Sequence, residues 1–390
     1  MKKIYFSGVF PRIYSAIELL MNYPPKGYEY IVPENKTKAN FLRFLLDSSL
    51  IKFIYRNIIK GIFDTSNWYS KMSAVEVPND ADLVIPINGQ IESDKPFVVL
   101  IVDTPIGLAS YSYDKFLKEK KDIENKLLSP LCKRIIVFNE SGIKEIRKYF
   151  STKVIKKTVL VRAAVLKQNF TKNYNRNKIN ITFMGSTGNP DDFYIKGGLE
   201  AMESFSRISQ EFDNVSMIVR CKVPEEVKKK YASVKNLLIL SQPLDLKRWF
   251  SFLQETDIAL QPGHIYPLMA TLESLSLGTP VIMLDTWGVR DYLVNNKNAI
   301  LIKPSDKIKG YRAKDYPLNV RTKYFIEDIK NLDNRVIEDL CNALRKLIEN
   351  PKLRERLGKN GKHDADTKFS IETRNKKLKK IFDQATSKKL

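Results

Sequence analysis

The sequence contains few of the residues that build disulfide frameworks or thiolate metal centres. Its three cysteines, Cys132, Cys221 and Cys341, are scattered and include no CxxC pair. An odd number of distant cysteines argues against both kinds of site and favours a reducing compartment. We therefore expect a cytoplasmic protein whose thiols stay reduced.

Long apolar runs and histidines are also scarce. No run approaches the ~20 apolar residues of a membrane-spanning helix, and the opening MKKIYFSGVF is expected to form a strand instead of a signal peptide. There are two histidines, and two Asp-x-Asp strings lie at residues 80–82, beside a strand, and at 364–366, in a helical tail. These residues make a poor ligand set for a cation, so no metal is expected.

Positive charge, in contrast, is abundant. The 66 Lys and Arg residues exceed the 44 Asp and Glu residues, which gives a net charge of +22. Nucleic acid, an anionic lipid surface and phosphorylated substrates would all suit this charge, and a Lys-rich background composition would also explain much of it. Its basic residues are spread along the chain, without a recognised nucleic-acid-binding module.

One long stretch, Asn40 to Phe63, combines apolar and basic residues. Lys52, Arg56 and Lys60 recur at helical spacing beside bulky apolar side chains. Such a stripe predicts either a helix packed on its own sheet with a solvated basic edge, or an amphipathic helix lying on an anionic membrane. The second alternative would make the protein peripheral to the inner face of the membrane.

The length of 390 residues exceeds that of one ordinary hydrophobic core, so two domains are expected. Strands and helices alternate in both halves, which predicts an α/β protein, and the polar segment 169–178 between them reads as a linker. Expected strands cover 3–6, 28–32, 82–88, 97–102, 134–138, 158–162, 179–184, 215–220, 237–240, 256–260, 281–284 and 299–302. Expected helices cover 14–21, 140–149, 199–209, 246–254, 268–277, 334–349, 352–357 and 370–384, with a break at Pro351.

The stretch from Leu253 to Leu293 predicts a strand, a Pro-Gly loop, an apolar helix and a second strand. Its loop and helix start are expected at the carboxyl end of a parallel sheet, where α/β proteins bind phosphorylated ligands. Glu273 is the only acid on the apolar helix. A buried acid is costly unless something binds it, whereas a solvated acid on the polar side of the helix is the plain alternative. Asp103 also follows an apolar strand, at a position suited to a functional side chain.

The order of several motifs resembles glycosyltransferase family 4, the group 1 glycosyl transferases, whose fold is GT-B. The resemblance rests on Phe183-Met-Gly185, Lys196-Gly197, the sequence LESLSLGTPV at 272–281, Gly288-Val-Arg-Asp291 and the sequence NPKLRERLG at 350–358. It covers most of the chain and is strongest after Ile179. It implies two Rossmann-like domains facing a cleft: an acceptor-side domain at 1–168, the linker at 169–178, a nucleotide-sugar domain at 179–365, and a helix at 366–390 that packs back on the first domain.

The resemblance also implies roles for individual residues. Lys196 would neutralise the donor pyrophosphate, work for which other glycosyltransferases use a metal. Backbone N–H groups near Gly185, Ser186 and Thr187 would add hydrogen bonds to the phosphates. Glu273 would accept hydrogen bonds from the ribose hydroxyls.

The chain departs from the family pattern at several points. Ser186 stands where the family usually has Arg, and Arg220 is a candidate for the missing charge. The first acid of the family's Glu-x7-Glu pair is replaced by Ile265, while His264 lies one residue out of register. No histidine matches the acceptor-side histidine of many members, and Asp103 occupies a comparable strand end. Gly8 and Asp103 are the acceptor-side candidates.

These observations predict a retaining, nucleotide-sugar-dependent hexosyltransferase. Lys196, Glu273, His264 and Asp103 are its candidate catalytic residues, and the acceptor is expected to be a glycan or a lipid-linked glycan. Retention is implied by the resemblance alone. Two alternatives remain: a basic nucleic-acid-binding protein, and a GT-B-like protein that binds a sugar nucleotide without transferring the sugar.

Overall fold

The computed structural model describes residues 1–7, 15–32, 77–86, 93–109, 111–186, 190–242, 246–308 and 322–387. They form two compact units, the first comprising Met1–Ala164 with Ile371–Leu390 and the second Val165–Ser370. The segment 169–178, predicted as a linker, contains no helix or strand and falls inside the second unit. The exact domain limits stay predictions, and Gly8, Thr187 and the stretch from Asn40 to Phe63 lie outside the described residues.

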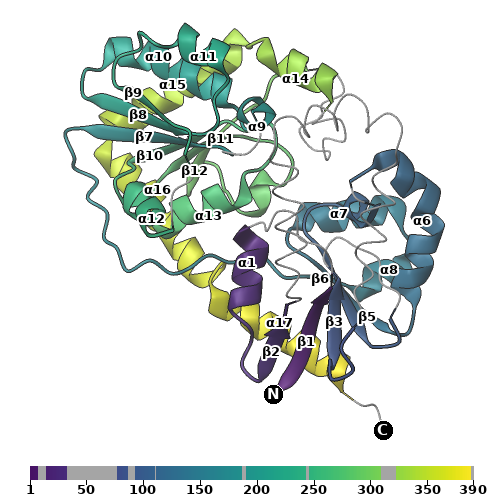
Figure 1. Ribbon diagram of the computed structural model, residues 1–390. Helices are drawn as coiled ribbons and strands as arrows, with labels where there is room; N and C mark the ends of the chain where they lie inside the picture. The colour runs from purple at the N-terminus through teal and green to yellow at the C-terminus, as the bar shows by residue number, and fades with distance from the viewer. Residues whose placement is uncertain are drawn as a thin grey trace. The chain divides into compact units, whose positions relative to one another are not determined.

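The first unit contains a parallel six-stranded sheet with the order β2-β1-β3-β4-β5-β6 (Figure 1). Its strands are β1 (Lys2–Ser7), β2 (Tyr28–Ile31), β3 (Leu83–Pro86), β4 (Phe97–Ile101), β5 (Cys132–Val137) and β6 (Thr158–Leu160). Its helices are α1 (Ser15–Asn22), η2 (Pro105–Ala109), α6 (Tyr113–Leu128), α7 (Glu140–Tyr149), α8 (Thr152–Lys157) and α17 (Ile371–Thr386). Because α6, α7 and α8 pack on one face and α17 contacts β3 and β5, the strands are covered by helices.

Helix α17 is joined to the first unit by specific contacts. Its Phe382 ring lies edge-on to Tyr28 of β2, with ring centroids 5.3 Å apart. The Tyr28 hydroxyl donates a hydrogen bond of 2.7 Å to Oδ1 of Asp383. The final helix of the chain therefore completes the unit that the first strand begins.

The second unit also contains a parallel six-stranded sheet, with the order β12-β11-β10-β7-β8-β9. Its strands are β7 (Ile179–Met184), β8 (Val215–Arg220), β9 (Leu237–Leu240), β10 (Ile258–Gln261), β11 (Val281–Leu284) and β12 (Ala299–Ile302). Its helices are α9 (Asp191–Ile195), α10 (Gly198–Glu211), α11 (Glu225–Lys230), α12 (Leu246–Gln254), α13 (Leu268–Ser276), η3 (Val289–Asp291), α14 (Lys323–Lys330), α15 (Asn334–Glu349) and α16 (Pro351–Thr367). Helices α10, α11 and α15 lie over one face of the sheet, and α12, α13 and α16 over the other (Figure 1).

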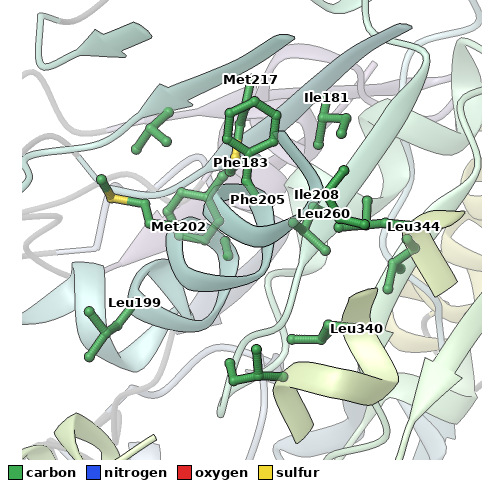
Figure 2. Packing of buried hydrophobic residues seen from close by; sticks show 14 of the residues in the cluster. Ile181, Phe183, Leu199, Met202, Phe205, Ile208, Met217, Leu260, Leu340 and Leu344 are labelled. Atoms are coloured by element: carbon green, nitrogen blue, oxygen red, sulfur yellow. The ribbon is translucent and has the colours of Figure 1, made fainter. Parts of the chain in front are cut away.

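The core of the second unit lies between the sheet and helices α10 and α15. Figure 2 shows Met202, Phe205 and Ile208 of α10 near Phe183 and Met217 of the sheet, and all of them belong to one buried cluster. Each fully buried side chain of this size stabilises the fold by about 1.5–3 kcal/mol. The core therefore fixes the sheet, and with it the loops at the strand ends.

Helix α16 differs from the expectation of a short helix at 352–357. Pro351 begins this helix instead of only interrupting the chain, and Asn350 caps it by accepting from the Leu353 N–H at 2.9 Å. The helix then continues through Gly358, where a Cβ would collide with the Gly278 carbonyl. Close approach of α16 to α13 explains a glycine inside a helix.

The α/β class and the two parallel sheets confirm the fold predicted from the sequence. In the part of the chain that the structure describes, no helix is both long enough and apolar enough to cross a membrane.

Candidate functional site

The order in which the chain adds strands to the second sheet reverses between β7 and β10. The chain runs from β7 outward to β8 and β9, then returns to β10 and proceeds to β11 and β12 on the other side. Parallel α/β sheets bind ligands outside the carboxyl ends of the strands at such a point. Gln261 lies at the end of β10, is fully buried and joins β10 to β7 at this point. With its amide oriented to match the Met184 backbone, it accepts from Met184 N at 2.8 Å and donates to Met184 O at 3.1 Å.

Gly185 follows β7 directly at this edge. Its N–H donates to the Arg220 carbonyl at 2.9 Å, and Nη1 of Arg220 donates back to the Gly185 carbonyl at 3.3 Å. A Cβ on Gly185 would collide with Sγ of Cys221. Ser186 accepts from the Lys222 N–H at 3.0 Å. The loop after β7 is therefore fixed by the end of β8, and its glycine allows this close approach.

The Lys196-Gly197 turn lies against the loop after β10. Gly197 has a φ of +79°, and a Cβ there would collide with the Pro262 carbonyl. The His264 N–H donates to the Ile195 carbonyl at 3.0 Å. Because the half-buried Lys196 lies between these two contacts, its backbone is held next to the carboxyl end of β10, immediately before α10 begins.

Glu273, in the middle of α13, receives a hydrogen bond from another helix. Nε1 of Trp249 on α12 donates to Oε2 of Glu273 at 3.0 Å. The Arg220 guanidinium lies over the Trp249 ring, 4.9 Å from its centroid. The structure thus brings the predicted donor-binding residues Arg220 and Glu273 together at Trp249, and Arg220 also bonds Gly185.

Electrostatics at this cluster follow from its burial. Desolvation raises the pKa of Glu273 from 4.5 to about 7, although the Trp249 hydrogen bond and the Arg220 charge both lower it. Desolvation also lowers the pKa of Arg220, against the attraction of Glu273. A ligand that donates hydrogen bonds to such a carboxyl stabilises its ionised form.

The His264 side chain points into the core of the second unit. Its Nε2 lies 2.8 Å from Oε1 of Glu200 on α10, and its ring lies edge-on to Phe325 at 6.1 Å. His264 is 3% exposed and Glu200 is 5% exposed. This geometry is that of a buried polar pair, and the catalytic role of His264 stays a prediction.

In the first unit, Asp103 follows β4 as predicted from the apolar run. A Cβ on Gly142 of α7 would come within 2.7 Å of its carbonyl oxygen, so the helix start packs tightly on this strand end. Asn139 caps the same helix by accepting from the Gly142 N–H at 2.6 Å. The described residues give Asp103 a position at a strand end, and its acceptor-side role stays a prediction.

The two Asp-x-Asp strings are engaged in structural contacts. Oδ2 of Asp82 accepts from the Lys3 N–H at 2.7 Å. Asp364 accepts from Nδ2 of Asn298 at 2.9 Å and pairs with Lys368 at 2.7 Å. Among the described residues, no group of three or more His, Cys, Asp or Glu side chains has the arrangement of a metal site.

Trp249 is the candidate that motif spacing did not reveal. It is one of three tryptophans in the chain and stacks on Phe252, three residues further along α12, at 5.6 Å. An aromatic pair on a helix usually indicates only packing. Nothing in the sequence relates its N–H to an acid 24 positions away.

No protein-family model and no curated protein sequence matches this chain. Among solved structures, it is similar to HepE from Anabaena in complex with UDP-glucose, with a TM-score of 0.59 and 10% identity over 98% of this chain and 99% of that one. A glycosyltransferase from Rickettsia africae has a TM-score of 0.59 and 11% identity over 100% and 99%. WaaG, a glycosyltransferase involved in lipopolysaccharide biosynthesis, has a TM-score of 0.55 and 14% identity over 98% and 99%.

The chain spans 57% of the length of TarM, which it matches over 82% of its own residues with a TM-score of 0.55. At 10–15% identity, these similarities show the fold: two parallel-sheet units of the GT-B type.

Proposed function

We propose that this protein transfers a sugar from a nucleotide-sugar donor to an acceptor. The observation that carries the proposal is the carboxylate of Glu273, held by Trp249 beside the Arg220 guanidinium. This cluster lies at the carboxyl edge of a GT-B sheet, where phosphorylated ligands bind. One carboxylate that accepts from ribose hydroxyls, next to cations for a pyrophosphate, suits a nucleotide diphosphate.

The donor's leaving group explains the need for cations. Cleavage of the sugar–phosphate bond leaves a diphosphate, so catalysis requires charge stabilisation at the phosphate oxygens. Lys196 supplies one positive charge, Arg220 a second, and the amides after β7 supply hydrogen-bond donors. A fixed cation with oriented amides performs this work without a metal ion. We therefore expect activity to persist in EDTA; loss on chelation and recovery with Mn²⁺ would contradict this mechanism.

A uridine diphosphate sugar is the first donor to test, because HepE was solved in complex with UDP-glucose. The proposed transfer retains the configuration of the sugar, as the resemblance to family 4 implies. A glycan or lipid-linked glycan is the proposed acceptor. Attachment to an anionic membrane through the stretch from Asn40 to Phe63 is part of the same proposal, with about 1 kcal/mol from each basic residue near the surface.

A thermal-shift series with UDP, UDP-glucose and other sugar nucleotides tests the proposal. A ligand at 100 times its Kd stabilises the folded chain by about 2.7 kcal/mol. Release of UDP from a stabilising donor is then measured with and without candidate acceptors. If no nucleotide or sugar nucleotide stabilises the protein, the proposed donor site is wrong.

Binding without transfer is the second candidate function, because Ile265 stands where the family carries its first acid. Stabilisation by a sugar nucleotide, without UDP release across a panel of glycan and lipid-linked acceptors, would favour this candidate.

A further inference from the structure

Trp249 occupies an unusual position in the donor site. Its indole N–H donates to Oε2 of Glu273, and its ring carries the Arg220 guanidinium. Resting on the proposed function, we propose that Trp249 is a positioning residue for donor recognition: it fixes one oxygen of Glu273 and leaves the other to accept from the donor's ribose.

The contacts of the Trp249 ring and N–H support the positioning role. Trp249 is 8% exposed, and its ring contacts two side chains, Arg220 at 4.9 Å and Phe252 at 5.6 Å with an interplanar angle of 26°. A buried indole with these two neighbours has little rotamer freedom, which restricts the direction of its N–H. Within the described part of the chain, Trp249 is the one donor to the Glu273 carboxylate. The second carboxylate oxygen therefore retains its capacity to accept.

The absence of charge on the Trp249 indole also supports the positioning role. A Lys or Arg bonded to Glu273 would neutralise its charge and occupy its oxygens. The described residues Arg220 and Glu273 form no direct ion pair; Nη1 of Arg220 bonds the Gly185 carbonyl instead. Trp249 orients the acid without cancelling its charge, and it holds the cation on its ring face. Both charges thus remain available to opposite parts of one ligand, the ribose hydroxyls and the phosphates.

A consequence for pH dependence separates positioning from simple packing. The groups that act on the Glu273 carboxyl are the Arg220 charge from β8 and the Trp249 N–H from α12, and both lower its pKa of about 7. Removal of the N–H raises this pKa further, so a larger fraction of Glu273 is protonated at neutral pH. A protonated carboxyl accepts more weakly from ribose hydroxyls. The loss should therefore be partly recovered at higher pH.

Calorimetric titration of the full chain with UDP-glucose, between about pH 5.5 and about pH 8.5, measures this effect. The diphosphate diester keeps its charge over this range, so the protein supplies the titration. Trp249→Phe keeps an aromatic ring and removes the N–H. Phe252→Leu is the matched control, because it disturbs the same stack without removing a donor to Glu273. Glu273→Gln, alone and combined with Trp249→Phe, completes a double-mutant cycle.

We expect wild-type affinity to rise with pH through about 7 and then level off. Trp249→Phe should bind about three- to tenfold more weakly at pH 7 and have its midpoint at higher pH. Phe252→Leu should keep the wild-type midpoint. Glu273→Gln should have no such pH dependence, and Trp249→Phe should cost nothing more in that background.

Two results would overturn the inference alone: an unchanged midpoint in Trp249→Phe, or an equal loss at every pH in both Trp249→Phe and Phe252→Leu. If the wild-type protein binds no sugar nucleotide at any pH, the proposed function itself fails. The two failures are therefore distinguishable.

Discussion

Two acids in the second unit, Glu200 on α10 and Glu273 on α13, are held in different ways. Glu200 is 5% exposed and pairs with His264, itself buried, at 2.8 Å. Glu273 is half-buried and receives its hydrogen bond from the neutral Trp249. The first acid is bonded to a group that can itself carry a charge, whereas the second acid is oriented by a donor that cannot.

The difference indicates which acid is available to a ligand. Glu200 and His264 line a small pocket with both apolar and polar residues, and each is at most 5% exposed, so the pair belongs to the interior. A buried ionisable group is tolerated when it is paired, and removal of its partner lowers the free energy of unfolding. Among the described residues each acid keeps one oxygen without a hydrogen-bond partner, but that of Glu200 is buried, whereas Glu273 is only half-buried and its pKa is raised by desolvation to about 7. Perturbed carboxyls with unused acceptor capacity are typical of binding sites.

The strongest test of the comparison is His264→Ala. Removal of the imidazole leaves the Glu200 carboxyl buried without this partner, so the free energy of unfolding should fall by about 3–5 kcal/mol. Urea denaturation of the wild-type and variant proteins measures the loss. Glu200→Gln is the control, since it keeps an acceptor of the same size and should lose less. Unchanged stability with lost sugar transfer would instead support the catalytic role predicted from the sequence.

The matching test on the other acid is Glu273→Gln. Hydrogen bonds from ribose hydroxyls to an ionised carboxylate are worth about 1.5–3 kcal/mol, so UDP-glucose should bind roughly 10- to 100-fold more weakly. Isothermal titration calorimetry at pH 8, where Glu273 is ionised, gives the comparison. Glu255→Gln is a suitable control because Glu255 is exposed and forms a surface ion pair with Arg176. Equal affinities in the wild type and Glu273→Gln would remove Glu273 from the donor site.

Lys196→Ala tests the cation proposed to bind the donor pyrophosphate. Lys196 precedes α10, which carries Glu200, and its carbonyl lies near Gly263. Loss of one partly exposed cation should weaken UDP binding by about tenfold. Uridine, which has no phosphates, should bind the variant and the wild type equally. An equal loss for uridine and UDP would indicate a change in the loop after β10 in place of a phosphate contact.

Much of this fold could be predicted from apolar runs bounded by turn residues. The limits of β7, β8, β9, β11 and β12 agree with the sequence-based ranges because each strand is a short apolar segment between polar ones. Helix α6 was missed because only Phe116, Ile123 and Leu127 are buried among its many charged residues. Its helical period is therefore faint in the sequence.

The candidate site was predictable only in part. Glu273 could be identified because an isolated acid on an apolar helix contradicts its surroundings. Its partner could not, since the hydrogen bond to Trp249 joins two helices through tertiary packing. The same holds for His264, whose partner Glu200 lies 64 positions away. Sequence patterns predict which side chains face inward, and packing decides which of them meet.

A last prediction, made without any ligand, concerns the pH dependence of stability at Glu273. Burial raises the pKa of this carboxyl from 4.5 to about 7, so the folded state binds its proton more tightly than the unfolded state does. Its contribution to stability is therefore fully present below pH 4.5 and is lost as pH rises to about 7. Glu273→Gln has no proton to lose. Relative to the wild type, its free energy of unfolding should increase from about pH 5 to about pH 8 by about 2 kcal/mol, after allowance for partial exposure.

Urea denaturation of both proteins at several pH values, without nucleotide, measures this difference. Many other groups titrate over the same range, but they are common to both proteins and cancel in the comparison. A constant difference across the range would mean that Glu273 is as well solvated in the folded chain as in the unfolded one. In that case its isolation on an apolar helix would carry no functional information, and the contrast with Glu200 would be one of exposure alone.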